Sequence, residues 1–308
     1  MNRRVRVGAV VLTYNSAEDL PACLDGLLSQ VGVDLRVIVV DNASSDQSRA
    51  LMQASLRERV PDAPVLPVAA ATAERVGDAR AVFVVNDRNA GYSAGNNIGA
   101  RLAVAGGCEA VLIVNPDVRI EDAGYVAALA ERMTADPTCA VASSRILGLS
   151  GRDENPLREP GFWEELLWPR QFAPKAFRPK PIVVPPVGPG PVIAEKVHGC
   201  CMLLRATFLE DIGYLDENVF LYCEEPILAA QARRRGGRLI VVPGVTALHA
   251  HVASRKGNSS RRMLQFIRSR LYYINAYSTH NRVRRVTLRG SYALLYAFHR
   301  LKAGMQGT

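Results

Sequence analysis

Ala110-Val111-Leu112-Ile113-Val114 is an unbroken apolar run, and Asn115-Pro116-Asp117-Val118 follows it directly. An apolar run of this length, bounded by turn residues, predicts a strand that is buried on both faces, as in a parallel sheet. In open sheets of this kind, ligands bind just beyond the carboxyl ends of the strands. Asp117 is therefore placed to meet a phosphate-bound metal ion, although Asn-Pro-Asp is also common turn chemistry.

The first 114 residues alternate between strand-like and helix-like segments. Strands are predicted at residues 5–12, 36–40, 81–85 and 110–114, and helices at residues 20–28, 46–58 and 93–105. This alternation predicts right-handed βαβ units with helices on both faces of the sheet. The expected fold class is therefore α/β, with a Rossmann-like, mostly parallel central sheet.

Polar or small residues follow the predicted strands, at the edge where such a sheet binds its ligands. The candidate ligand contacts are Thr13, Tyr14, Asn15, Asp41, Asn89, Gly91, Asn96, Asn115 and Asp117. The carboxylate of Asp41 can accept a hydrogen bond from a nucleobase or a ribose hydroxyl, whereas Asp46 belongs to the start of the next helix. Gly91 lies at a turn where the backbone can approach a ligand, while Gly95 and Gly99 share a helix face that can press on the sheet.

Composition and motif spacing argue against several classes of protein. An apolar content of 48% suits a packed globular core, and no run reaches the roughly 18 apolar residues of a membrane span. The six cysteines show no CxxC spacing, which favours reduced thiols, and no cleavable signal segment follows the basic N-terminus, so we expect a cytoplasmic protein. The glycine spacing is not GxGxxG and no P-loop lysine motif occurs, which disfavours a dinucleotide dehydrogenase and a P-loop NTPase.

The second half of the chain begins with a proline-rich stretch and then returns to regular structure. Ten of the 18 prolines lie between Pro156 and Pro191, which predicts an extended segment that either borders a pocket or is a surface linker. Beyond it, strands are predicted at residues 198–205 and 239–242, and helices at residues 208–213 and 224–236. The second of these helices opens with the acid pair Glu224-Glu225, and His249 follows the last strand.

The excess positive charge lies in residues 255–308. This tail has twelve Lys or Arg residues and no Asp or Glu, so the rest of the chain is slightly acidic. Apolar residues at helical spacing from Met263 to Ile274, and again from Tyr292 to Leu301, predict basic amphipathic helices. Two alternatives stay open for them: docking on an anionic membrane surface, or packing of the apolar stripe on the body. No RNA-binding or helix-turn-helix signature occurs, so nucleic acid is not an expected partner.

A set of short motifs occurs in order between residues 5 and 255. They are Val-Leu-Thr-Tyr-Asn at 11–15, Val-Asp-Asn-Ala-Ser-Ser-Asp at 40–46, Asn89-Ala90-Gly91 with Gly95-Asn96, Asn-Pro-Asp-Val at 115–118, His-Gly-Cys-Cys-Met-Leu at 198–203, Gly-Tyr-Leu-Asp-Glu at 213–217, Glu224-Glu225 and His249. In this order they resemble the family 2 glycosyltransferases of the GT-A fold, especially the bacterial rhamnosyltransferase-like enzymes of polysaccharide biosynthesis. The resemblance does not extend well into the basic tail.

The resemblance implies a sugar-nucleotide donor bound by the first-half loops. Thr13, Tyr14, Asn15 and Asp41 would contact the base and ribose, with Asn89, Gly91, Asn96 and Asn115 nearby. Asp117 resembles the last carboxylate of the family's DxD metal motif, whose first position is Asn115 here. The implied cofactor is a divalent ion, Mg²⁺ or Mn²⁺, held by Asp117, by diphosphate oxygens and water, and by His249.

The resemblance also implies the catalytic acids and a departure from the family pattern. The family's base is the second acid of a Glu-Asp pair, and Glu225 stands in that position here. It would take the proton of an acceptor hydroxyl that attacks the anomeric carbon from the face opposite the leaving group, which gives inversion. Glu224 would orient the acceptor or cap the helix. Many members have Asp where this chain has Ile227, which leaves donor and acceptor preference open.

The implied organisation is a sugar-nucleotide-binding half at residues 1–120, an acceptor-binding half of the same domain at residues 121–254, and the basic tail at residues 255–308. The enzyme would move a sugar, with dTDP-rhamnose as the first guess for the donor, to a glycan or lipid-linked acceptor in cell-surface polysaccharide synthesis. A homodimer is compatible with the sequence. Two alternative functions stay open. One is a catalytically inactive partner of an active transferase that binds a sugar nucleotide or a glycan. The other is a nucleotidyltransferase, although the expected glycine-rich loop is missing near residues 13–16.

Overall fold

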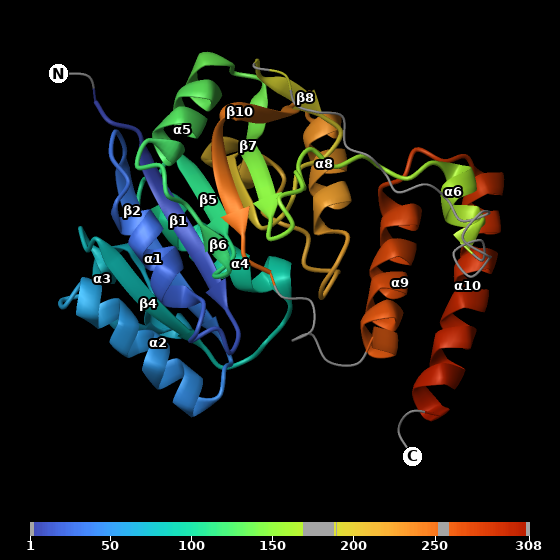
Figure 1. The fold of residues 1–308 in the computed structure, drawn as a ribbon, viewed down its shortest axis with the longest axis horizontal. Coiled ribbons are helices and arrows are strands. Elements are labelled where there is room, and N and C mark those ends of the chain that lie inside the picture. Colours follow the sequence, from blue (N-terminus) through green and yellow to red (C-terminus); the bar gives the residue numbers. More distant parts are fainter. Residues whose placement is uncertain (1–2, 169–187, 189, 252–258, 306–308) are drawn as a thin grey trace.

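The computed structural model describes residues 3–168, 188, 190–251 and 259–305. One ten-stranded sheet forms the centre of the molecule (Figure 1). Its strands are β1 (Arg6–Thr13), β2 (Asp34–Asn42), β3 (Val65–Pro67), β4 (Ala81–Asn86), β5 (Ala110–Val114), β6 (Val118–Arg119), β7 (Cys139–Gly148), β8 (Val192–Ala194), β9 (Cys201–Arg205) and β10 (Arg238–His249). Their order is β3-β4-β2-β1-β5-β9-β7-β10-β6, and β8 pairs with β10.

The five neighbouring strands β3, β4, β2, β1 and β5 are parallel to one another. This confirms the α/β class and the mostly parallel sheet. β9 is antiparallel to both of its neighbours, β5 and β7. The strand expected at residues 198–205 starts only at Cys201, because residues 199–200 form a turn at the edge of the sheet. The strand expected at residues 239–242 continues to His249. β7 was not predicted.

Helices cover both faces of the sheet. They are α1 (Leu20–Leu28), α2 (Asp46–Arg59), α3 (Ala73–Val76), α4 (Tyr92–Ala105), α5 (Tyr125–Ala135), α6 (Phe162–Leu166), α7 (Ala206–Asp211), α8 (Glu224–Arg234), α9 (Ser259–Ala276) and α10 (Arg282–Met305), with a short 3₁₀ helix η1 (Val68–Ala70). One apolar core lies under α1, α2 and α5, and the other lies under α4, α7 and α8. The helix α5 was not predicted, and residues 169–187, with much of the proline-rich stretch, lie outside the described residues.

The strand β1 is buried on both faces because successive side chains enter different cores. Ala9 and Val11 enter the core under α1, while Val10 enters the core under α4. Gly99 of α4 lies directly over Val10, and a Cβ at position 99 would come within 2.5 Å of Val10 Cγ1. The interpretation of Gly99 as a close-packing residue on the sheet is confirmed.

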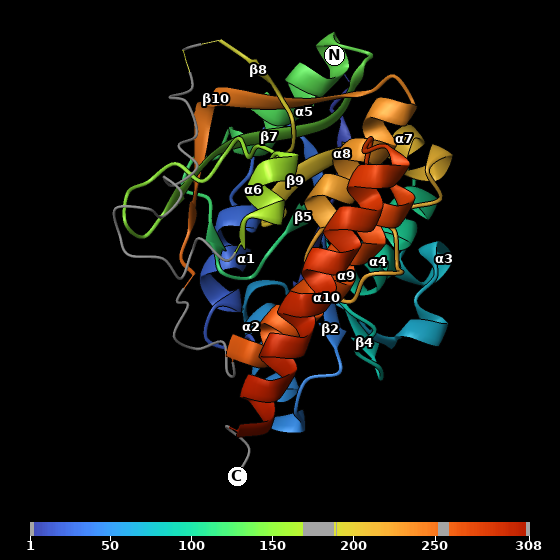
Figure 2. The same ribbon diagram turned by 90° about the vertical axis from the view of Figure 1, so that its right-hand side faces the viewer.

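The basic tail forms two helices that pack on the body and on each other (Figures 1 and 2). Ile267 and Ile274 of α9 are buried in a third apolar cluster with Ile227 of α8 and with Leu288 of α10. Polar contacts support this packing, because the Ser269 hydroxyl donates to the Leu221 carbonyl at 2.7 Å. Of the two alternatives for the tail, packing of the apolar stripe on the body is therefore the one observed for α9. Among the described helices, none is long and apolar enough to cross a membrane.

Gly99→Ala should destabilise the fold because the new methyl group overlaps Val10 across a packed helix–sheet contact. We expect the free energy of unfolding to fall by about 1–3 kcal/mol, measured by urea denaturation. Gly290→Ala is the matched control, since Gly290 lies in α10 and a Cβ there meets no atom within 4 Å. The control should be neutral or slightly stabilising. Equal losses in both variants would contradict the close-packing role of Gly99.

Candidate active site

A cleft of 1190 Å³ opens beyond the carboxyl ends of the parallel strands, where the sheet was expected to bind its ligand. Of the candidate residues from the sequence, Thr13, Tyr14, Asn89, Gly91, Asn115, Asp117, Glu224, Glu225 and His249 line it. They come from the ends of β1, β4, β5 and β10 and from the start of α8. Segments more than 100 residues apart in the chain thus meet in one cleft.

Three candidate residues lie outside this cleft. Asn15 lines a neighbouring cleft of 760 Å³, which shares Tyr14 and Asp117 with the first. Asp41 is fully buried and accepts a hydrogen bond from Arg49 Nε at 2.7 Å. Asn96 is also fully buried and donates to the Tyr92 carbonyl at 3.0 Å. A ligand can reach Asp41 only if its pairing with Arg49 changes, so its contact with a nucleobase stays a prediction.

The turn between β4 and α4 shows why position 91 is a glycine. Gly91 has a φ of +106°, and a Cβ there would come within 2.3 Å of the Phe220 carbonyl oxygen. The next residue, Tyr92, donates its backbone N–H to the same carbonyl at 2.8 Å. Asn89 braces the turn, because its Oδ1 accepts from Gly91 N–H at 3.0 Å. Gly91 therefore joins the first-half turn to the loop that precedes the acid pair.

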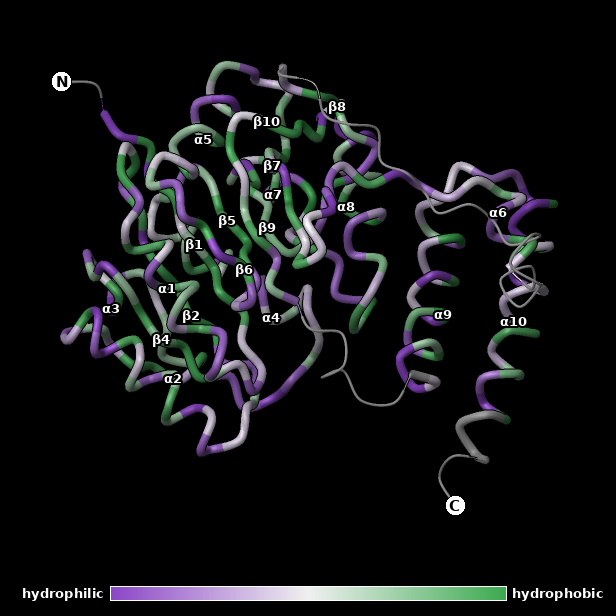
Figure 3. Tube along the Cα trace, in the orientation of Figure 1, coloured by the Kyte–Doolittle hydropathy of each residue, from purple (hydrophilic) through white to green (hydrophobic). Residues whose placement is uncertain are grey.

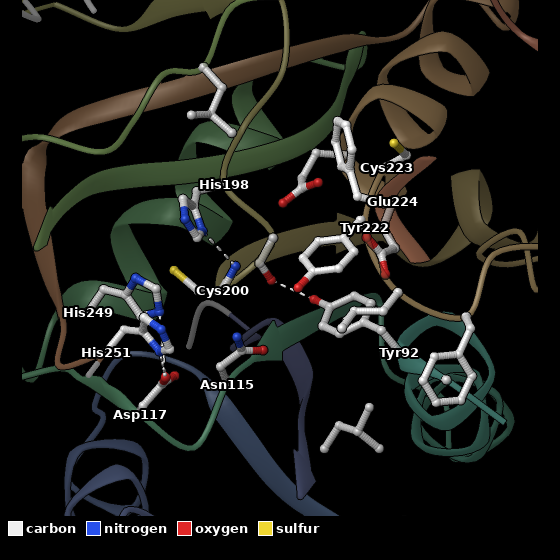
Figure 4. Close-up of a pocket in the computed structure, with 18 of the residues that line it drawn as sticks. Tyr92, Asn115, Asp117, His198, Cys200, Tyr222, Cys223, Glu224, His249 and His251 are labelled. Atoms are coloured by element: carbon white, nitrogen blue, oxygen red, sulfur yellow. Dashed lines mark hydrogen bonds and ion pairs between the residues drawn. The ribbon is translucent and has the colours of Figure 1, made fainter. Parts of the chain in front are cut away.

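Asp117 lies beside the imidazoles of His249 and His251 (Figure 4). Its Oδ2 is 3.1 Å from His251 Nδ1 and 3.6 Å from His249 Nε2. The two imidazole rings are stacked with centroids 5.3 Å apart. One ligand atom from each of Asp117, His249 and His251 lies within 4.8 Å of the other two. The side chains thus converge as the ligands of a metal ion do.

A second carboxylate lies behind His249. Glu154 Oε2 is 2.8 Å from His249 Nδ1, on the side of the ring away from Asp117. Glu154 reaches this position past Gly148, where a Cβ would come within 2.5 Å of Glu154 Oε1. Gly148 is the register partner of His249 between β7 and β10. A carboxylate that accepts from Nδ1–H leaves Nε2 of the same imidazole free to bind a metal ion.

The electrostatics of Asp117 favour its charged form. Burial by itself would raise the pKa of Asp117, but hydrogen bonds and charge from His249 and His251 lower that pKa to about 2. Burial would lower the pKa of His249, whereas Asp117 and Glu154 raise it above its ordinary value. A metal ion that binds beside the ionised carboxylate would displace protons from the neighbouring imidazole nitrogens.

The donor set fits a divalent cation. Asp117 Oδ1 is buried and has no hydrogen-bond partner among the described residues, so one carboxylate oxygen is left unsatisfied. A buried and unpaired carboxylate oxygen is costly unless a cation or a water satisfies it. One carboxylate and two imidazoles leave coordination positions for oxygen atoms of a ligand.

The acid pair begins α8 after a strained turn. Tyr222 and Cys223 have φ values of +71° and +68°, which are unusual for residues other than glycine. Glu224 Oε1 is buried and has no hydrogen-bond partner in the described part of the chain. Burial, followed by the nearby charge of Glu225, raises the pKa of Glu224 to about 8. Glu224 therefore keeps its proton to a higher pH than an exposed carboxyl does.

The sequence reasoning missed several residues of the cleft. His251 is two residues after His249, and a His-x-His spacing at a strand end indicates two side chains on one face. Glu154 lies in a loop and gave no signal, since its partner His249 is 95 residues away. Phe266 and Arg270 of α9 and Tyr292 of α10 also line the cleft, so the basic tail forms part of its wall.

Comparison with known proteins identifies the family. A family model described as glycosyl transferase family 2 matches residues 9–193. The low-salt glycan biosynthesis hexosyltransferase Agl10 of Haloferax volcanii is 25% identical over 245 residues, which cover 78% of this chain and 66% of Agl10. The match thus spans slightly less than two thirds of that relative's length.

Solved structures share the fold. The mannosyltransferase PcManGT of Pyrobaculum calidifontis, in complex with GDP-Man and Mn²⁺, has a TM-score of 0.56 and 18% identity, covering 99% of this chain and 80% of that one. GalNAc-T7 with UDP, GalNAc and Mn²⁺ has a TM-score of 0.59 and 11% identity, covering 95% of this chain and 55% of that one. These likenesses confirm the GT-A fold.

Glu154→Ala should weaken the binding of Mn²⁺ because His249 would lose the carboxylate that orients its ring. We expect a loss of about 10–100-fold in affinity, measured by calorimetric titration of the folded protein with Mn²⁺ alone. Glu154→Gln should retain part of the affinity, since its amide oxygen can still accept from Nδ1–H. Asp153→Ala is the control, because Asp153 pairs with Arg145 at 2.9 Å. A loss as large in the control would show that charge or loop order, not ring orientation, is responsible.

Glu224 should make the stability of the protein depend on pH. Folding raises the pKa of Glu224 to about 8. The Glu224 carboxyl of the folded protein therefore keeps a proton that the same group in the unfolded chain releases at lower pH. The wild type should therefore lose stability as pH rises from about 5 to 8. The glutamine of Glu224→Gln cannot ionise. The free energy of unfolding of this variant, measured by urea denaturation, should therefore rise relative to that of the wild type across this pH interval. Glu121→Gln, at an exposed position, should follow the wild-type curve, and parallel curves for all three proteins would contradict the assignment.

Proposed function

The chain belongs to glycosyl transferase family 2, and we propose that it transfers a sugar from a nucleotide-diphosphate sugar to a hydroxyl of a glycan or of a lipid-linked saccharide. The observation that carries the proposal is a single cleft with two different sets of side chains. Asp117 and its histidines suit a cation that binds a diphosphate, and Glu224 and Glu225 suit the removal of a proton from an acceptor. Transfer of a sugar to a hydroxyl needs both.

We assign the donor to residues 1–120 and the acceptor to residues 121–254, with residues 255–308 as the basic tail. Thr13 and Tyr14 line the donor end of the cleft, and Tyr14 is 56% exposed, so its ring can contact a nucleobase. Glu224 and Glu225 line the same cleft from the start of α8. This arrangement supports a donor and an acceptor that meet between the two halves of the domain.

We propose that Asp117, His249 and His251 hold the divalent cation. When bound, the cation supplies stabilisation of the negative charge that accumulates on the departing nucleoside diphosphate. The two imidazole nitrogens favour Mn²⁺ over Mg²⁺, because Mg²⁺ prefers oxygen ligands throughout. Mn²⁺ is also the ion in the complexes of PcManGT and GalNAc-T7.

Glu225 is the proposed base, and the raised pKa of Glu224 supports this division of roles. The raised pKa of Glu224 favours its protonated form, which can donate a hydrogen bond to the acceptor, and Glu225 takes the proton of the acceptor hydroxyl. The acceptor oxygen forms a bond to the anomeric carbon while the bond from that carbon to the phosphate oxygen breaks on the opposite face. The nucleoside diphosphate leaves with the bonding electron pair, and the configuration of the sugar is inverted.

The finer identity of the substrates rests on resemblance. We retain dTDP-rhamnose as the proposed donor and cell-surface polysaccharide synthesis as the proposed setting, while Agl10 is by its name a hexosyltransferase of glycan biosynthesis. We further propose that the protein works in the cytoplasm, in peripheral contact with an anionic membrane. A homodimer is proposed on the resemblance alone, and sedimentation of the pure protein tests it.

The test of the function is turnover and binding with a panel of dTDP, UDP and GDP sugars in the presence of Mn²⁺. A donor present at 100 times its Kd should add about 2.7 kcal/mol to the free energy of unfolding. Asp117→Ala should remain folded and lose both the Mn²⁺-dependent stabilisation and turnover. Donor binding without turnover in any acceptor mixture would favour an inactive partner protein, and no binding of any nucleotide would sink the proposal.

Glu225→Gln should separate the base from the rest of the site. The amide keeps the shape and hydrogen bonding of Glu225 but cannot take a proton, so kcat should fall by about 10²–10⁴-fold with donor affinity nearly unchanged. Glu224→Gln should lower kcat much less, because Glu224 is proposed to orient the acceptor and not to take its proton. If Glu224→Gln abolishes turnover and Glu225→Gln leaves it within a few-fold of wild type, the two roles are reversed.

A further inference from the structure

We propose that the outward face of α10 docks on an anionic lipid surface and thereby presents the cleft to a lipid-linked acceptor. The docking is argued from α10 itself, whereas the nature of the acceptor rests on the proposed function. The apolar stripe of α9 is already buried against the body, so α9 offers no such surface. The membrane-facing surface is therefore on the other helix of the tail.

The helix α10 is apolar on two opposite faces. Its inner face is buried and carries Leu288, Tyr292 and Leu295, with the polar His299 near its end. Its outer face carries Val283 (74% exposed), Val286 (60%), Leu294 (71%), Phe298 (45%) and Leu301 (71%). At 3.6 residues per turn these five residues fall within an arc of about 120°. Figure 3 shows hydrophobic colour on the side of α10 that faces away from α9.

Basic side chains border the exposed apolar stripe along both edges. Arg282, Arg289 and Arg300 are exposed and lie along one edge by helical spacing. Arg284 lies along the other edge, with its guanidinium 5.3 Å from the centre of the Phe162 ring. In an interfacial helix the apolar stripe enters the acyl region of the lipid, and cations on either side of the stripe reach the lipid phosphates. The helix α10 has this pattern. No acidic residue occurs from position 255 to the end of the chain, so nothing in the tail opposes anionic lipid.

The position of α10 connects docking to the cleft. Tyr292 lines the cleft from the inner face of α10, while Leu294 points outward by its spacing of two residues. A helix is about 10–12 Å across with its side chains, so a lipid surface on the outer face would lie roughly that far from the cleft wall. A saccharide carried on a lipid would then reach the acid pair without leaving the membrane surface.

The charge pattern favours lipid over a second copy of this chain. Two copies that paired through the outer faces of α10 would bring the bordering arginines of both helices together, and like charges across an interface are costly. Anionic lipid instead neutralises these arginines. We therefore commit to lipid, and self-association is an alternative that the experiment detects.

The experiment measures binding of the full chain to vesicles of phosphatidylglycerol mixed with phosphatidylcholine, and to vesicles of phosphatidylcholine alone, by co-sedimentation at low and high salt. The wild type should bind the anionic vesicles and release them as salt rises. The double variant Leu294→Gln/Leu301→Gln should bind at least tenfold more weakly because two large apolar side chains no longer enter the lipid. Each of Arg282→Gln, Arg289→Gln and Arg300→Gln should weaken binding roughly fivefold.

Matched controls lie on α2, on the body of the protein. Leu51 is 56% exposed and Arg57 is exposed on that helix. Leu51→Gln and Arg57→Gln remove the same chemical groups from a surface that is not proposed to dock, so they should bind vesicles like the wild type. All variants should keep the Mn²⁺-dependent stabilisation by whichever of dTDP, UDP and GDP stabilises the wild type, which shows that the cleft is intact.

The outcomes separate this inference from the proposed function. Vesicle binding that is equal in wild type and the Leu294→Gln/Leu301→Gln variant overturns the docking proposal, even if nucleotide binding persists. A different result is that the Leu294→Gln/Leu301→Gln variant sediments as a monomer where the wild type sediments as a dimer, with vesicle binding unchanged. That result would assign the outer face of α10 to a second copy of the chain and would also overturn the docking proposal. Loss of nucleotide binding in Asp117→Ala with vesicle binding retained supports the separate roles of cleft and helix.

Discussion

The antiparallel ladder between β5 and β9 is the constraint on which the cleft depends. Ala110 pairs with Arg205 and Val114 pairs with Cys201, so the end of β5 lies beside the beginning of β9. The ladder continues one step beyond the strands, where Asn115 N–H donates to the Cys200 carbonyl at 2.7 Å. Because neighbouring antiparallel strands begin and end at opposite edges, the turn at 115–117 must meet the turn at 198–200. The parallel pairing of β10 with β7 then brings His249 to the same edge.

In the proposed metal site Asp117 is the one carboxylate of the motif, because Asn115 stands at its first position. Asn115 contributes no charge, and the imidazoles of His249 and His251 supply neutral donor atoms instead. Glu154 returns negative charge to the cluster from behind His249, without occupying a position at the ion. Such an outer carboxylate raises the basicity of the imidazole that binds the metal. The proposed site would therefore attract a cation through softer donor atoms than two carboxylates offer.

The tail joins the core and the surface in one hairpin. α9 buries its apolar stripe against α8, and α10 buries its inner face against α9. The buried Arg270 of α9 donates to Glu165 at 3.0 Å, and Tyr292 of α10 donates to the same carboxylate at 2.9 Å. These contacts fix the hairpin at the wall of the cleft, so the tail is part of the site and not an appended anchor. The exposed large apolar side chains of the hairpin lie on the outer face of α10.

Local pattern was enough for much of the first half of the chain. The helix at Leu20–Leu28 and the strand at Ala110–Val114 lie at the predicted residues, because apolar periodicity and run length report on short segments. The order of the strand ends indicated which loops carry Thr13, Asn89 and Asp117 to one edge. Tertiary structure decided the rest. Asp117 and His251 are 134 residues apart and Glu154 and His249 are 95 apart, and no local pattern records such pairings. Sequence spacing likewise marked α9 and α10 as amphipathic, whereas only their packing decided which apolar face remains in contact with water.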